Sequence, residues 1–420
     1  MKLRHHSHRS RLRGFGYLRR LGPGLVTGAS DDDPSGIGTY SQVGAAFRFG
    51  LLWTAPLSLP LAAAVQEASA RLGLVTGKGL AALIRQRFSR RVLYAAVALV
   101  AAANVFNIGA DLGSMAASAR LVLPVPFVPT LVVVTLVIIA LEVFVPYHRY
   151  SRVLRWLTLS LGTYVVVLFA VRVDWGLVAR RTFVPSITLD KPELAGIIAI
   201  LGTTISPYLF FWQCSEEVEE EREQGERGAV GDVHVRAMRV DVIAGMVSAV
   251  AVMFSIMVAS AATLGAHGVT TIQSAQQAAR ALRPIAGSFA SLLFSLGIVG
   301  TALLAIPVLA GSTAYALAET FGWNEGLYHS LRDAWGFYGT IATAMVLGLA
   351  LTLVGINPIR TLYLAAILNG LAAPPLILLL LVISRSKRVM GEHAGGGLSS
   401  VLVGITLVLM AGLPIAYLVR

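Results

Sequence analysis

The stretch Ala29-Ser30-Asp31-Asp32-Asp33-Pro34-Ser35-Gly36 places three carboxylates and a proline between apolar segments. An aspartate in the core of a bilayer costs roughly 2.5–3.5 kcal/mol, so carboxylates there usually face a cavity and serve a function. Proline has no backbone N–H and interrupts a helix. A helix that breaks beside acids at mid-membrane depth presents free backbone carbonyls and carboxylates together. The stretch therefore indicates ion transport.

The composition indicates a polytopic membrane protein. Of the 420 residues, 56% are hydrophobic and only 13% are charged, whereas soluble domains have about 25% charged residues. The net charge of +12 is interpreted as basic loops that set membrane orientation, not as a nucleic-acid surface. A single cysteine, Cys214, excludes an internal disulfide. We therefore expect the lipid bilayer, and no nucleic acid, as a partner.

Apolar runs of about 20 residues predict an all-α protein with about eleven transmembrane helices. Residues 1–20 are expected to form a basic cytosolic tail and residues 21–420 a single transmembrane domain. Most of the 34 Lys and Arg residues fall on the side of the N-terminus, which predicts a cytosolic N-terminus in a bacterial plasma membrane. The expected spans are 21–45, 50–71, 92–118, 124–146, 154–173, 194–214, 240–264, 287–315, 339–355, 360–384 and 398–418.

A second interruption is predicted in the sixth span, at Gly202-Thr203-Thr204-Ile205-Ser206-Pro207-Tyr208. Broken helices at matching positions of two halves indicate an inverted-repeat transporter with its site at the breaks. The repeats would cover residues 21–173 and 194–384, and the helix at 398–418 would lie outside them. The alternative is that Pro207 is an ordinary kink, because proline is common in membrane helices.

The residues around the two breaks predict a cation site made of oxygen atoms. Asp33, immediately before the first break, is the first candidate for a direct metal ligand. Further oxygens are expected from Ser30, Gly36, Thr203 and Ser206. Oxygen donors suit hard cations such as Mg²⁺, Ca²⁺ and Mn²⁺.

Successive helical residues are turned by about 100°, so the three aspartates cannot all face one cavity. Asp31 and Asp32 are expected to bond to the unwound backbone or to partner helices. In the alternative interpretation, all three are hydrated in a vestibule.

Other polar residues within apolar spans are candidates for the ion pathway. Asp111 is expected either to relay a proton or to pair with an arginine. Asn369 could supply a further oxygen to the site or cap a neighbouring helix, and Tyr208 lies beside the second break. The acidic stretch 215–227 is interpreted as a solvated extension of the sixth helix, with an acidic collar that attracts cations as the alternative.

Several motifs resemble the Nramp family of divalent-metal transporters. The stretch from Gln66 to Lys78 (QEASARLGLVTGK) is similar to the second-helix signature of that family, and Gly311-Ser312-Thr313-Ala314-Tyr315 is similar to part of its eighth helix. Gly22-Pro23-Gly24 and the stretch from Gly44 to Trp53 fit the flanks of its first helix. The resemblance implies a LeuT-type fold of five plus five helices, with helices 1 and 6 broken.

The chain departs from the family pattern at the site itself. The Asp-Pro-Gly-Asn motif of the first helix reads Asp33-Pro34-Ser35-Gly36 here, so the asparagine is absent. The Met-Pro-His motif of the sixth helix reads Ser206-Pro207-Tyr208, without thioether or imidazole. Ser114 stands where the third helix often has a second acid. The resemblance therefore implies the related branch that transports Mg²⁺ and Mn²⁺, with weak or no proton coupling.

The sequence thus predicts a monomeric secondary transporter of Mg²⁺ or Mn²⁺ that works by alternating access. The metal would be substrate, with no cofactor and no enzymatic activity. One alternative is a proton-coupled importer of Mn²⁺ or Fe²⁺, and another is a cation-coupled LeuT-type transporter of organic solutes. An intramembrane enzyme acting on lipid pyrophosphates is less favoured, because its acids would be spaced by a helical turn.

Overall fold

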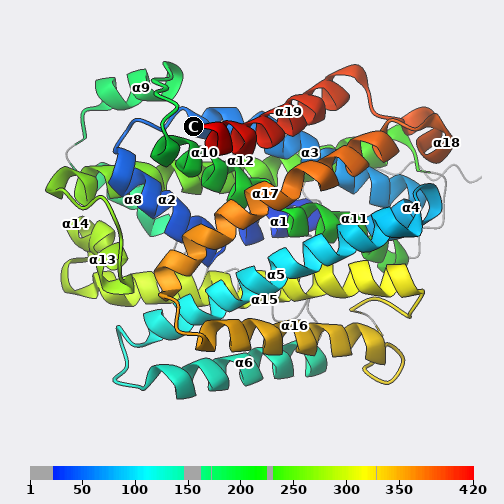
Figure 1. The fold of residues 1–420 in the computed structure, drawn as a ribbon, viewed down its shortest axis with the longest axis horizontal. Helices are drawn as coiled ribbons and strands as arrows, with labels where there is room; N and C mark the ends of the chain where they lie inside the picture. The colour runs from blue at the N-terminus through cyan, green and yellow to red at the C-terminus, as the bar shows by residue number, and fades with distance from the viewer. Residues whose placement is uncertain (1–21, 146–161, 172, 225–229, 328) are drawn as a thin grey trace, which may run out of the picture.

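The computed structural model describes residues 22–145, 162–171, 173–224, 230–327 and 329–420. Within these ranges the regular structure is entirely helical. The predicted tail at residues 1–20 lies outside the described residues, as does part of the expected span at 154–173. Figure 1 shows long helices running roughly parallel to one another, with short helices and loops at the two ends of the bundle.

Long helices occupy the expected spans. They are α3 (Thr54–Thr76), α5 (Arg90–Ala119), α6 (Phe127–Phe144), α12 (Asp232–Thr263), α15 (Ala290–Phe321), α16 (Trp335–Leu353), α17 (Pro358–Ser384) and α19 (Gly397–Val419). The described part of the fifth span contains α8 (Gly162–Ala170). Short connecting helices are α4 (Leu80–Arg87), α9 (Trp175–Phe183), α13 (Ala275–Ala279), α14 (Arg283–Ala286) and α18 (Lys387–Met390).

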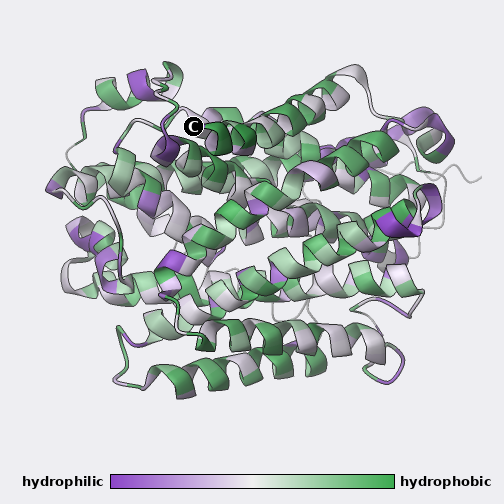
Figure 2. Cartoon of the chain, in the orientation of Figure 1, coloured by the Kyte–Doolittle hydropathy of each residue, from purple (hydrophilic) through white to green (hydrophobic). Residues whose placement is uncertain are grey.

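The outer surface of the bundle is apolar. Eight helical stretches in the described residues are long and hydrophobic enough to cross a membrane, and Figure 2 shows their hydrophobic character, with hydrophilic residues gathered at α4, α9 and α18. Large apolar side chains point outward, among them Phe144, which is 77% exposed, and Phe169, which is 83% exposed. Exposed apolar surface of this extent fits contact with lipid.

Both predicted breaks are present. The first span is divided into α1 (Pro23–Asp31) and α2 (Pro34–Phe47), and the sixth into α10 (Lys191–Thr204) and α11 (Pro207–Gln224). The interpretation of Pro207 as an ordinary kink is wrong, because the chain leaves the helical conformation at Ile205, where φ is −121° and ψ is 54°. The repeat boundaries at 21–173 and 194–384 stay a prediction.

Glycines allow the broken helices to approach their neighbours closely. α1 packs on α12, while α11 packs on α3, and α10 packs on α17. A Cβ atom at Gly28 of α1 would overlap the carbonyl oxygen of Gly245 in α12, and one at Gly202 of α10 would overlap that of Ala366 in α17. Small residues at such contacts are the usual means of tight helix packing in membranes.

Candidate metal-binding site

The first break is built around the side chain of Asp33. α1 ends at Asp31, and α2 begins at Pro34, where the missing N–H of proline is no disadvantage. Asp33 caps α2: its Oδ1 atom accepts hydrogen bonds from the backbone N of Gly36 at 2.6 Å and from Oγ of Ser35 at 2.7 Å. Asp33 is the predicted principal metal ligand, and its Oδ1 atom is therefore occupied by hydrogen bonds that hold the carboxylate in place.

The second break is organised by Ser206. Its hydroxyl lies 2.8 Å from the carbonyl oxygens of both Gly202 and Thr203, to which it donates. The Thr203 carbonyl, predicted to face an ion, is thus engaged locally, although a carbonyl oxygen keeps a second lone pair. The oxygen of Ser206 also retains lone pairs, since its contacts to the two carbonyls use only its proton.

The two breaks meet and form one site. The Tyr208 hydroxyl, at the start of α11, lies 3.0 Å from the carbonyl oxygen of Ser30 and 3.3 Å from Oδ2 of Asp33, and it donates to them. The hydroxyls of Ser35 and Thr203 are 3.3 Å apart. Side chains and backbone of both broken spans therefore face each other, as the paired breaks predicted.

Buried carboxylate oxygens without partners surround this junction. Both oxygens of Asp31, both of Asp111 and one of Asp32 have no hydrogen-bond partner, and the three residues are at most 4% exposed. Within the described part of the chain, no Lys, Arg or His pairs with them or with Asp33. A buried charge without a partner costs several kcal/mol, so bound cations or protons must neutralise these groups. Burial this complete also makes the vestibule interpretation wrong for this conformation.

Helix α5 adds Asp111 and an asparagine pair to the site. Asp111 lies close to Asp33 and to the backbone amide of Ser35, and the predicted arginine partner is not found among the described residues. The Oδ1 atom of Asn369 accepts from Asn107 at 2.8 Å, and Nδ2 of Asn369 lies 3.3 Å from the Ser206 hydroxyl. Asn369 therefore supports the second break, and its oxygen is already engaged.

Sequence reasoning missed Asn107. It precedes Asp111 by four residues, so both lie on one face of α5. Its Oδ1 atom is buried and has no hydrogen-bond partner. That spacing was the available signal, and it places a neutral oxygen beside an acid.

The site offers few charged ligands and many neutral oxygens. Among the described residues, no group of three or more His, Cys, Asp or Glu side chains is arranged to hold one metal ion. The contacts above bring together Ser30, Asp33, Gly36, Asp111, Thr203, Ser206, Tyr208 and Asn369. Whether Gly36 or Thr203 binds an ion through its carbonyl stays a prediction.

The acidic extension of the sixth span is helical as far as Gln224, as predicted, but two of its acids are buried and not solvated. Glu217 and Glu219 are 5% and 6% exposed. Glu217 accepts a hydrogen bond from Gln213 at 2.9 Å, and Glu219 accepts from Tyr315 and, at 2.8 Å, from the backbone N of Leu327.

Burial also affects an acid in the loop that follows α15. It raises the pKa of Glu325 to about 7, while Arg222 acts in the opposite direction. Together with the buried Glu217 and Glu219, this shows that one side of α11 is an internal contact surface.

A buried polar site between two broken helices, in a protein whose described residues include eight helical stretches long and apolar enough to cross a membrane, is the arrangement expected of a membrane transporter. The model of the family "Natural resistance-associated macrophage protein-like" matches residues 24–420. The chain belongs to the Nramp family. It is a transporter and not an enzyme, because its curated relatives are named as cation transporters.

Two relatives show the degree of similarity. The divalent metal cation transporter MntH of Caldanaerobacter subterraneus subsp. tengcongensis is 26% identical over 393 residues, which is 92% of this chain and 89% of the relative. The MntH protein of Ralstonia nicotianae is 29% identical over 397 residues, covering 91% and 86%.

Solved structures share the fold. The Eremococcus coleocola manganese transporter has a TM-score of 0.74 at 19% identity, covering 96% of this chain and 87% of that one. A nucleobase-cation-symport-1 family transporter in a closed conformation has a TM-score of 0.60 at 13% identity, covering 95% and 91%. At these identities the likeness concerns the fold alone, and it agrees with the predicted all-α architecture.

Proposed function

We propose that this protein is a secondary transporter that carries divalent metal cations, Mg²⁺ and/or Mn²⁺, by alternating access. The observation that carries the proposal is the set of buried carboxylates where the two helix breaks meet, which pair with no cationic side chain among the described residues. Relatives named as divalent metal cation transporters add support. Asp33 would supply charge, while the Ser206 hydroxyl and the carbonyls near Ser30, Gly36 and Thr203 would supply neutral oxygens.

The chemistry of the donors favours hard cations. Every polar group at the junction presents oxygen, and Ser206 and Tyr208 stand where the family motif has methionine and histidine. Mg²⁺ gives up its water reluctantly and is usually bound by one or two carboxylates with several waters retained. Direct binding by Asp33, with the neighbouring buried aspartates adding negative charge and several neutral oxygens nearby, fits that preference, and the ion would keep part of its hydration shell.

The membrane potential would drive inward movement. One charge crossing 100 mV gains about 2.3 kcal/mol, and a divalent ion gains about twice that. We expect a monomer in a bacterial plasma membrane with its N-terminus in the cytosol, an orientation favoured by the distribution of Lys and Arg.

The second candidate is a proton-coupled importer of Mn²⁺ or Fe²⁺. Buried acids such as Asp31 and Asp111, which have unpartnered oxygens, are groups that can carry protons. A transporter of organic solutes is less favoured, because the cluster of acids would repel the carboxylate of a zwitterion.

Flux measurements in proteoliposomes test these alternatives. Purified protein should take up Mg²⁺ and Mn²⁺ when a potential, negative inside, is imposed. A pH dye inside the vesicles should show no stoichiometric acidification. Acidification that follows metal uptake in a fixed ratio would establish the proton-coupled alternative, and absence of metal uptake would contradict the proposed function.

Metal preference should depend on residue 206. We expect Ser206→Met to increase the preference for Mn²⁺ over Mg²⁺ by about tenfold, because a thioether favours softer transition metals. Competition of unlabelled Mg²⁺ against Mn²⁺ uptake measures the shift. Ser206→Ala removes the same contacts to Gly202 and Thr203 without adding sulfur, so an equal shift in that variant would show that the thioether is not the cause.

A further inference from the structure

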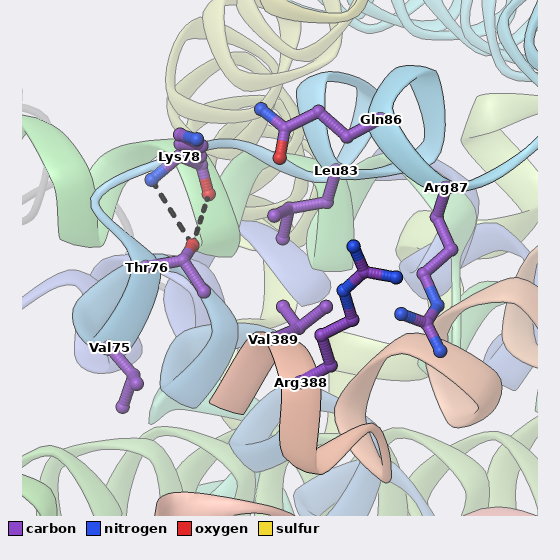
Figure 3. Close-up of a pocket in the computed structure, with 8 residues that line it drawn as sticks. All are labelled: Val75, Thr76, Lys78, Leu83, Gln86, Arg87, Arg388 and Val389. Atoms are coloured by element: carbon purple, nitrogen blue, oxygen red, sulfur yellow. Dashed lines mark hydrogen bonds between the residues drawn. The ribbon is translucent and has the colours of Figure 1, made fainter. Parts of the chain in front are cut away.

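A pocket of about 790 Å³ opens at the end of the bundle where α4 and α18 lie. It shares no lining residue with the aspartate site. Its walls come from the end of α3, from the turn that follows it, from α4 and from α18 (Figure 3). The lining residues are Val75, Thr76, Lys78, Leu83, Gln86, Arg87, Arg388 and Val389.

The pocket is strongly cationic. Lys78, Arg87 and Arg388 line it, and none of its described lining residues is acidic. Figure 3 shows the side chains of Arg87 and Arg388 extending toward one another from separate helices. In the described part of the chain, neither guanidinium forms a hydrogen bond or an ion pair. Like charges brought together without a counter-charge favour a bound anion.

A neighbouring arginine shows the contrast. Arg85, on the same short helix as Arg87, uses its Nη1 atom to donate to the carbonyl oxygen of Glu319 at 2.9 Å. Arg85 therefore fastens α4 to the end of α15. Arg87 makes no such contact and remains available to a ligand.

The wall that carries Lys78 is held in a fixed conformation. Gly77 ends α3 in the left-handed region, with φ of 60°, which glycine adopts without strain. The Thr76 hydroxyl lies 3.3 Å from both the backbone N and the carbonyl oxygen of Lys78. The thiol of the buried Cys214 lies 3.5 Å from that same carbonyl oxygen. The turn is thus fixed by contacts on both of its sides.

We propose that this pocket binds an anion bearing a phosphate group, either the headgroup of an anionic lipid or a free phosphate ester. Arginine matches phosphate oxygens with pairs of parallel hydrogen bonds. The volume falls within the range of small-molecule sites. Thr76 and Gln86 add polar groups, while Val75, Leu83 and Val389 supply apolar walls. Basic pockets at the ends of membrane helices are suited to lipid headgroups.

Binding to the full-length protein in detergent tests the proposal. Short-chain phosphatidylglycerol and metal-free ATP serve as the two probes, with native mass spectrometry and the shift in melting temperature as readouts. At least one probe should bind, and Arg87→Gln with Arg388→Gln should weaken it by at least tenfold. Binding of phosphatidylglycerol alone identifies a lipid headgroup, and binding of ATP alone identifies a free phosphate ester.

The control is Arg91→Gln, which removes an exposed charge from the start of α5, outside the pocket. It should leave binding unchanged. Equal loss in the control, or undiminished binding in the double variant, would overturn the proposal, and so would binding of neither probe by the wild type. If the double variant does not fold, Arg87→Lys with Arg388→Lys keeps the charges but loses the paired geometry, and it should still weaken binding. Metal uptake is measured separately, so failure here leaves the proposed function untouched.

Discussion

Asp33→Asn should reduce Mg²⁺ and Mn²⁺ uptake by about 100-fold or more. Removing one member of a buried charge pair costs about 3–5 kcal/mol, and the lower value corresponds to roughly two orders of magnitude in affinity. Asparagine has the same shape and keeps an oxygen that can accept from Gly36 and Ser35, as Oδ1 of Asp33 does. It is also as good a helix cap as aspartate. The loss should therefore arise from the missing charge and not from unfolding.

Thermal stability separates these two explanations. Without metal, Asp33→Asn should melt no lower than the wild type, because it removes a buried charge that no cation among the described residues neutralises. With metal at about 100 times its Kd, the wild type should gain about 2.7 kcal/mol, and the variant should gain almost nothing. Melting curves with and without Mg²⁺ measure both quantities.

Asp333→Asn is the matched control, since it makes the same chemical change at an exposed loop residue. It should transport like the wild type and keep the metal-dependent gain in stability. Wild-type uptake by Asp33→Asn would contradict the role of Asp33, and equal loss in both variants would indicate a general effect of charge.

The fold was largely predictable because its decisive signals are local. Pro34 and Pro207 interrupt helices for reasons that lie within a few residues of each. Length and hydropathy placed the long helices. The close contacts of Gly28 with α12 and of Gly202 with α17 were not predictable, because many glycines in membrane helices have no such neighbour and only the assembled bundle selects among them.

The site was predictable in its location but not in its hydrogen bonds. Acids beside a proline pointed to Asp33, and the second proline pointed to Ser206. Which oxygens remain open depends on the partners of each group: Asn369 is engaged with Asn107, and the Thr203 carbonyl with Ser206. The acids after Cys214 appeared solvated because a run of charge usually is, whereas Glu217 and Glu219 are buried in the assembled bundle, the latter against Tyr315 of α15.

Gly28→Ala should loosen the contact between α1 and α12. The backbones of these helices touch at Gly28 and Gly245, and the added Cβ would overlap a carbonyl group that cannot move aside. The carboxylate of Asp241 also accepts a hydrogen bond from the backbone N of Gly24 at 2.6 Å, which fastens the start of α1 to α12. Overpacking costs typically 1–3 kcal/mol. In alternating access, α1 would leave α12 when this end of the molecule opens, so the variant should favour the open state by about 5- to 150-fold.

The accessibility of a single cysteine measures this shift. Cys214→Ser removes the native thiol, and Thr27→Cys introduces one at a position of α1 that is 0% exposed in this structure. In that background, Gly28→Ala should raise the labelling rate by a water-soluble maleimide at least fivefold. Gly404→Ala makes the same change in α19, where no atom lies within 4 Å of the new Cβ, and it should leave labelling unchanged. Unchanged labelling in Gly28→Ala would contradict the prediction that α1 separates from α12 when this end of the molecule opens, because the added carbon crowds this backbone contact.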